Sequence, residues 1–216
     1  MDLIFESVMN LLGFGIGLSI GTFAYRGYSN VGSPTLLRLT FAFLSISLGF
    51  LILWAQSMVD IFALSRPADV NSMLVIGLGF QALGYFFLAF SHSIQSLKFK
   101  HMAPAFALIS LAIAPLFVIP GNSIEHIIRS ISFILLVYGA TQTMTSYMWS
   151  KNRNTLIIAS GLALLALGEF IGWYNFIYPG SMFYYASIIV KIAGISAIFV
   201  PLYRFPMGRI KVGSSV

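Results

Sequence analysis

The chain consists mainly of long apolar stretches, separated by short segments rich in charged residues, Gly, Pro, Ser and Asn. A helix that crosses a bilayer needs about 20 mainly apolar residues. The pattern therefore predicts an all-α membrane protein, a seven-transmembrane-helix bundle in which residues 1–216 form a single transmembrane domain. The expected spans cover roughly 3–25, 36–60, 72–96, 103–120, 123–148, 155–178 and 181–203.

The composition supports a membrane location. The chain is 58% hydrophobic and 8% charged, with a mean hydropathy of +0.91, whereas soluble domains carry about 25% charged residues. A chain of this length cannot bury so much apolar surface inside itself, so the lipid bilayer is its first partner. We expect a multi-pass protein of the cell membrane. The acidic start, with Asp2 and Glu6, does not resemble a secretory signal peptide, so the first stretch is expected to persist as a helix.

The distribution of charge predicts the orientation and argues against nucleic-acid binding. The net charge is +6, but the basic residues fall between apolar stretches and form no continuous patch. They gather in the first, third and fifth loops and in the tail, at Arg26, Lys98, Lys100, Lys151, Arg153, Arg204, Arg209 and Lys211. By the positive-inside rule, the N-terminus lies outside and the C-terminus is cytoplasmic.

The chain partly repeats itself at a shift of 119 residues. Thr22 aligns with Thr141, and Trp54 with Trp173. The third and seventh spans align at a shift of 110, which places Gln81 on Lys191. We predict a 3+1+3 internal repeat, with halves at about 1–96 and 123–203 in parallel orientation and a linker helix at 103–120. Such repeats often place a binding site between the halves, near mid-membrane.

Two opposite charges lie deep in consecutive apolar spans. Glu169 and Lys191 fall at similar depth, and a Tyr178-Pro179-Gly180 turn makes their helices neighbours. A single charge at the centre of a spanning helix costs about 2.5–3.5 kcal/mol, so we predict that the two residues pair. Two interpretations stay open. The pair is either a structural clamp between the sixth and seventh helices, or part of a polar site for a ligand, an ion or a proton.

Other polar residues lie on the spans close to this pair. Gln81, Tyr85 and Trp173 could join a polar site, although interhelical hydrogen bonds or interfacial anchoring would explain each one alone. Under the repeat, Phe50 and Gln81 occupy the positions of Glu169 and Lys191, so the charged pair belongs to the second half only.

Two further patterns concern helix packing. Glu125 and Arg129 are spaced i, i+4 and are predicted to pair. Gly13, Gly17 and Gly21 share one face of the first helix, a pattern typical of close packing against another helix, in the same chain or in a second copy.

The sequence offers little for catalysis or metal binding. It has no cysteine, and its three histidines lie near helix ends on opposite sides of the membrane. No nucleophile-and-base constellation or phosphate-binding glycine loop is recognisable. We expect a protein that is not an enzyme and that holds no metal or other cofactor.

Three resemblances to known families follow from short stretches. VKIAGISAIF, around Lys191, is loosely similar to microbial rhodopsins, in which such a lysine would carry retinal. However, Ser187 stands where that family commonly has an aspartate. The three-one-three layout resembles SWEET-type sugar transporters, without their proline-glutamine signature. AYRGY (Ala24–Tyr28), LGFLILW and ALGYFFLAF resemble uncharacterised archaeal seven-helix integral membrane proteins, which implies a fold but no activity.

Three functional hypotheses follow. The leading one is a non-enzymatic polytopic membrane protein that acts as a sensor or as a subunit of a larger membrane complex, with other membrane subunits or its own copies as partners. The alternative is a small-solute or ion transporter with its site at Glu169 and Lys191. The third is a retinal-binding photoreceptor, with Lys191 as the attachment site.

Overall fold

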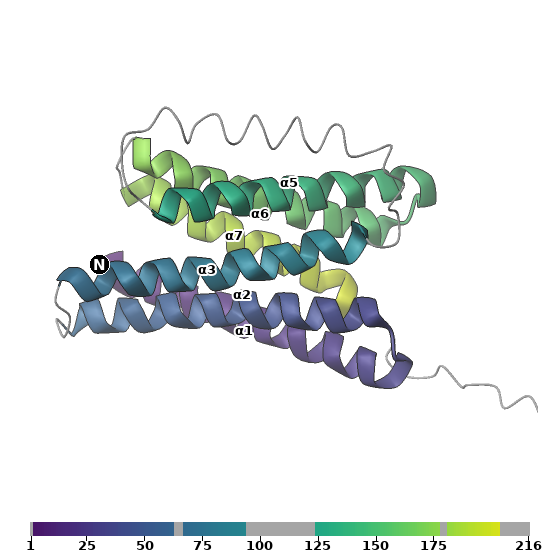
Figure 1. The fold of residues 1–216 in the computed structure, drawn as a ribbon, viewed down its shortest axis with the longest axis horizontal. Helices are drawn as coiled ribbons and strands as arrows, with labels where there is room; N and C mark the ends of the chain where they lie inside the picture. The colour runs from purple at the N-terminus through teal and green to yellow at the C-terminus, as the bar shows by residue number, and fades with distance from the viewer. Residues whose placement is uncertain (1, 63–66, 94–123, 178–180, 204–216) are drawn as a thin grey trace, which may run out of the picture.

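The structure, a computed structural model, describes residues 2–62, 67–93, 124–177 and 181–203. These residues form six long helices (Figure 1), each with a segment long and apolar enough to cross a membrane. The helices are α1 (Asp2–Val31), α2 (Pro34–Ile61), α3 (Pro67–Ser93), α5 (Ile124–Ser150), α6 (Arg153–Ile177) and α7 (Ser181–Tyr203). The described part of the chain is therefore all-α and of the multi-pass membrane class. The expected span at 103–120 lies outside the described residues, so the seventh helix stays a prediction, as does the orientation.

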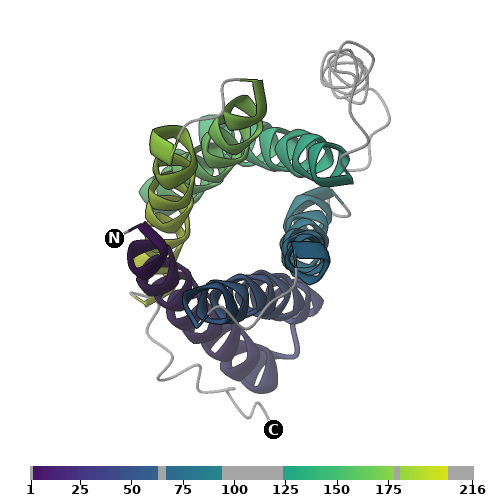
Figure 2. The same cartoon turned by 90° about the vertical axis from the view of Figure 1, so that its left-hand side faces the viewer.

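The six helices form a closed ring when viewed along their length (Figure 2). Each helix contacts the next one along the chain from α1 to α3 and from α5 to α7, α3 contacts α5, and α1 contacts α7. The first and last described helices are therefore neighbours, although they are far apart in the sequence.

A tight turn reverses the chain between α1 and α2. The Gly32 N–H donates to the Tyr28 carbonyl at 2.7 Å, and Gly32 has a φ of 69°, a left-handed conformation that glycine adopts at little cost. Pro34 then occupies the first turn of α2, where its missing N–H has no helical partner to lose. Because the turn is so short, α1 and α2 must run antiparallel.

The helices carry apolar side chains on both their inner and outer faces. Phe43, Ile46, Leu165 and Ile195 are fully buried inside the ring. Large apolar side chains are also exposed on the outer faces of the helices, among them Ile4, Leu12, Phe41, Ile76, Ile127 and Leu167. Helices that are hydrophobic all round are typical of membrane spans, so the exposed faces are suited to lipid.

Glycines bring two pairs of helices into close contact. Between α2 and α3, a Cβ added at Gly84 would lie 2.6 Å from the Ala42 carbonyl oxygen. Between α6 and α7, a Cβ added at Gly194 would lie 2.8 Å from the Gly161 carbonyl oxygen. Small residues at such crossings allow the backbones themselves to touch.

The glycine face of α1 packs within the same chain. A Cβ at Gly13 would meet the Phe50 ring, one at Gly17 would meet Ser47, and one at Gly21 would meet Leu44, all on α2. Of the two partners that the sequence left open for this face, the structure therefore shows the intrachain one.

We expect Gly84→Ala and Gly194→Ala each to lower the free energy of unfolding by about 1–3 kcal/mol, because the added methyl group meets backbone atoms. Gly79→Ala is the matched control, since nothing lies within 4 Å of its added Cβ. That control should be neutral or stabilising by up to about 1 kcal/mol, the usual gain of alanine over glycine in a helix. The measurement is denaturant unfolding in detergent micelles. Equal tolerance at Gly79 and Gly194 would contradict the close α6–α7 contact.

Candidate functional site: a buried charge cluster

The Glu169–Lys191 ion pair forms as predicted. The Lys191 Nζ atom lies 2.6 Å from Glu169 Oε1, and the two side chains are 5% and 1% exposed. The Lys191 stem passes over Gly168, where any side chain would collide with the lysine Cγ. The Ser187 hydroxyl, one turn earlier on α7, donates to the Gly168 carbonyl at 2.8 Å and fastens the two helices at this level.

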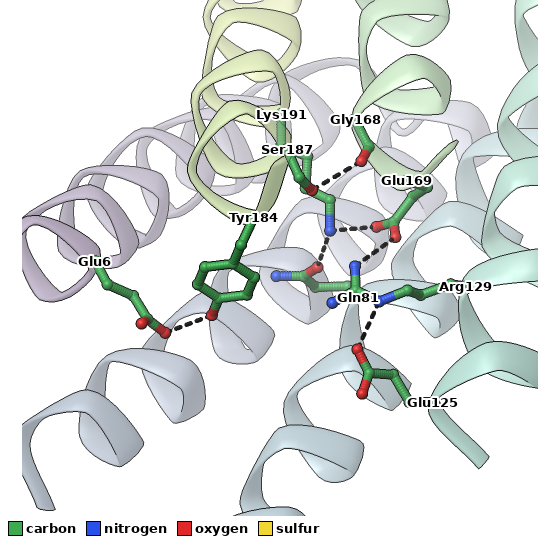
Figure 3. A network of polar contacts seen from close by, with 9 residues as sticks. All are labelled: Glu6, Gln81, Glu125, Arg129, Gly168, Glu169, Tyr184, Ser187 and Lys191. Atoms are coloured by element: carbon green, nitrogen blue, oxygen red, sulfur yellow. Dashed lines mark hydrogen bonds and ion pairs between the residues drawn. The ribbon is translucent and has the colours of Figure 1, made fainter. Parts of the chain in front are cut away.

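Arg129 joins this pair from a third helix (Figure 3). Its Nε atom donates to Glu125 Oε1 at 2.8 Å, the i, i+4 pair that the sequence predicts. Its Nη1 atom lies 3.4 Å from Glu169 Oε2, so the Glu169 carboxylate is shared by two cations. Gly172, one turn after Glu169 on α6, leaves room for the guanidinium, because a Cβ there would collide with it.

The four residues Glu125, Arg129, Glu169 and Lys191 are called the charge cluster below. Two cations face two carboxylates, so their formal charges cancel. Sequence reasoning treated Glu125–Arg129 and Glu169–Lys191 as separate pairs. The sequence feature that accompanies the contact between the two pairs is Gly172, whose missing side chain makes space for Arg129.

Two of the three polar neighbours predicted from the sequence lie at the cluster. The Gln81 Oε1 atom accepts a long contact of 3.5 Å from Lys191 Nζ. Tyr85 is fully buried, and its hydroxyl lies next to Glu169 without a hydrogen bond of good geometry. Trp173 is half-buried, its ring lies 6.1 Å from that of Phe170, and the structure shows no contact that links it to the cluster among the described residues.

A second polar contact lies beside the cluster and was not predicted. The Tyr184 hydroxyl donates to Glu6 Oε1 at 2.5 Å and so ties α7 to α1. The contact was not predictable, because nothing in the hydrophobic pattern shows that α1 and α7 are neighbours.

A small cavity adjoins the cluster. The centre of a water molecule can occupy about 20 Å³ of this cavity, so the cavity has room for roughly one water. Its polar lining comes from Asn10, Gln81, Arg129, Tyr184, Ser187 and Lys191, and its apolar lining from Phe50, Leu53, Leu74, Leu78 and Ile188. Asn10 on α1 is a further residue that sequence reasoning missed.

The arrangement defines what this site can do chemically. It offers cations, carboxylates and amides in an apolar surrounding, where a change in the charge of one member leaves the others uncompensated. Within the described ranges, no three His, Asp or Glu side chains gather as ligands for a metal ion.

Comparisons with models of protein families, with curated proteins and with solved structures found no match to this chain. The fold and site therefore define a class only, an all-α multi-pass membrane protein with a buried, charge-balanced cluster.

We expect Glu169→Gln to lower the free energy of unfolding by about 3–5 kcal/mol, because it leaves two buried cations with one carboxylate. Lys191→Met should also destabilise, through the opposite imbalance. The double variant restores the balance, so its cost should fall short of the sum of the two by about 0.5–3 kcal/mol.

The matched control for this double-mutant cycle is Arg153→Met, which removes an exposed cation at the start of α6 and should stay within about 0.5 kcal/mol of wild type. Chemical unfolding in micelles measures all four variants. Additive costs for the two cluster variants would show that Glu169 and Lys191 do not interact.

Proposed function

We propose that the protein is a non-enzymatic, multi-pass membrane sensor of the cell membrane, which acts as a subunit of a larger membrane complex. The charge cluster is its internal switch. A change in pairing at Glu169 is passed to α5, α6 and α7, and from their lipid-facing sides to a partner protein.

The observation that carries this proposal is the enclosure of the cluster. Glu169, Arg129 and Lys191 are all buried, and the adjoining cavity has room for about one water. A carrier of organic solutes needs a pocket of the size of its solute, which this cavity does not offer. By contrast, a neutral set of buried charges couples helix packing to the charge of each member, as a switch requires.

A partner protein would receive the signal. The segments between the predicted spans are short, so none of them can form an output domain. The α1 glycine face is occupied by α2 and supports no second copy at that position. The partner therefore binds the outer surface, which carries large apolar side chains.

We expect the tagged full-length chain, isolated in mild detergent from its native membranes, to bring down a membrane partner in a fixed ratio. Lys191→Met should change the recovered amount of that partner several-fold, whereas Arg153→Met should leave it unchanged. Quantitative mass spectrometry of the isolated complexes measures the ratio. A monodisperse monomer with no partner would contradict the proposal. Equal recovery of the partner with wild type and with Lys191→Met would also contradict it.

An ion transporter is the second candidate, and the position of the cavity favours it. Residues of α1, α2 and α3 line one part of the cavity, and residues of α5 and α7 line the rest. The site thus lies between the two halves of the proposed 3+1+3 repeat, where repeat-built transporters hold their substrates.

Matching contacts in the two halves support the repeat. At a shift of 119 residues, Gly49 corresponds to Gly168, and at a shift of 110, Gln81 corresponds to Lys191. A Cβ at Gly49 would lie 2.6 Å from the Gln81 Cγ, and one at Gly168 would lie 2.6 Å from the Lys191 Cγ. At the shift of 119, Glu6 corresponds to Glu125, and Asn10 corresponds to Arg129.

If the protein is a transporter, proteoliposomes should conduct at least one of H⁺, Na⁺, K⁺ and Cl⁻ faster than empty liposomes, and Glu169→Gln and Lys191→Met should abolish that flux. Arg153→Met should conduct as wild type does. Ion-sensitive dyes trapped in the vesicles give the rates. Flux equal to that of empty liposomes for all four ions would remove this candidate and leave the sensor proposal intact.

A further inference from the structure

The cavity beside the cluster contains polar side chains that the described protein does not satisfy. Asn10 is 1% exposed, and neither its side-chain nitrogen nor its oxygen has a hydrogen-bond partner among the described residues. Gln81 is equally buried, and its Nε2 atom also has no hydrogen-bond partner among the described residues. A buried polar group without a partner costs about 1–3 kcal/mol, so these amides favour a ligand in the cavity.

The charge balance around the cavity restricts the kind of ligand. The positive charges of Arg129 and Lys191 are matched by Glu125 and Glu169, so an ion of either sign would find no uncompensated partner in the cluster. Asn10 offers both a donor and an acceptor, and Gln81 offers a donor. While the cluster is paired as in the structure, the suitable ligand is therefore neutral, small, and able to donate and accept hydrogen bonds.

We propose that this cavity binds a single water molecule, which links Asn10 and Gln81 to the charge cluster. The volume of about 20 Å³ fits one water. A buried water makes about three hydrogen bonds to groups that lack other partners, which matches the Asn10 amide, the Gln81 Nε2 and a cationic donor of the wall.

The water site connects helices that are far apart in the sequence. Asn10 belongs to α1 and Gln81 to α3, whereas Arg129 belongs to α5 and Lys191 to α7. The Tyr184 ring forms another wall, and its hydroxyl continues the polar contacts to Glu6 (Figure 3). One water therefore completes a polar layer across the ring, from Glu6 to Glu169.

Radiolytic footprinting tests this site, because hydroxyl radicals made from a bound water oxidise the side chains that surround it. Phe50 lines the cavity and Phe43 does not, and the two rings are 1% and 0% exposed, so they form a matched pair. In the full-length protein in nanodiscs, we expect Phe50 to be oxidised several-fold faster than Phe43. Equal rates at Phe50 and Phe43 would overturn the proposal.

The variant Asn10→Leu fills the cavity with apolar atoms and removes two of the hydrogen-bonding groups. It should reduce the oxidation of Phe50 to the rate of Phe43, while buried Phe43 keeps its slow wild-type rate as a check of folding. Gln81→Leu serves in its place if Asn10→Leu does not fold. Continued fast oxidation of Phe50 in the folded variant would contradict the site.

An experimental density map provides a second measurement. It should show a peak within hydrogen-bonding distance of both Asn10 and Gln81, and a map that resolves other buried waters without this one would overturn the proposal. Neither measurement depends on a partner or on flux, so this proposal and the proposed function can fail separately.

Discussion

The structure depends on one carboxylate that is shared by two cations. Glu169 on α6 faces Lys191 from α7 and Arg129 from α5, so the three helices must cross the apolar layer with these residues at one level. A lone charge at this depth is expensive, and the short distances that avoid the cost require Gly168 and Gly172, which give the two cations room. The burial of charge and the close approach of the helices are thus a single constraint.

Sequence reasoning predicted the parts of this arrangement that concern consecutive helices. Six of the predicted spans correspond to described helices, although α1 runs to Val31, well beyond the predicted end near residue 25, because its polar last turns continue as helix outside the apolar stretch. The Glu169–Lys191 pair was predictable because a tight turn makes α6 and α7 neighbours, so depth could be counted from it.

Contacts between distant helices were not predictable. Hydropathy indicates which residues face away from water, but it does not indicate which spans are adjacent. The Tyr184–Glu6 contact joins residues 178 positions apart, and Asn10 meets the cavity only because the ring closes between α1 and α7. Arg129 and Glu169 lie on consecutive helices, but their contact was missed because the i, i+4 spacing already gave Arg129 a partner in Glu125.

Closure of the ring through α1 and α7 has a consequence for biosynthesis. The chain enters the membrane from its N-terminus, so α1 is present long before the helix that completes its surroundings. Until α7 arrives, Glu6 lacks the Tyr184 hydroxyl and Glu169 lacks the Lys191 amine. Among the described helices, α7 is made last and completes the polar interior, so an earlier intermediate carries unmatched charge in lipid until α7 inserts.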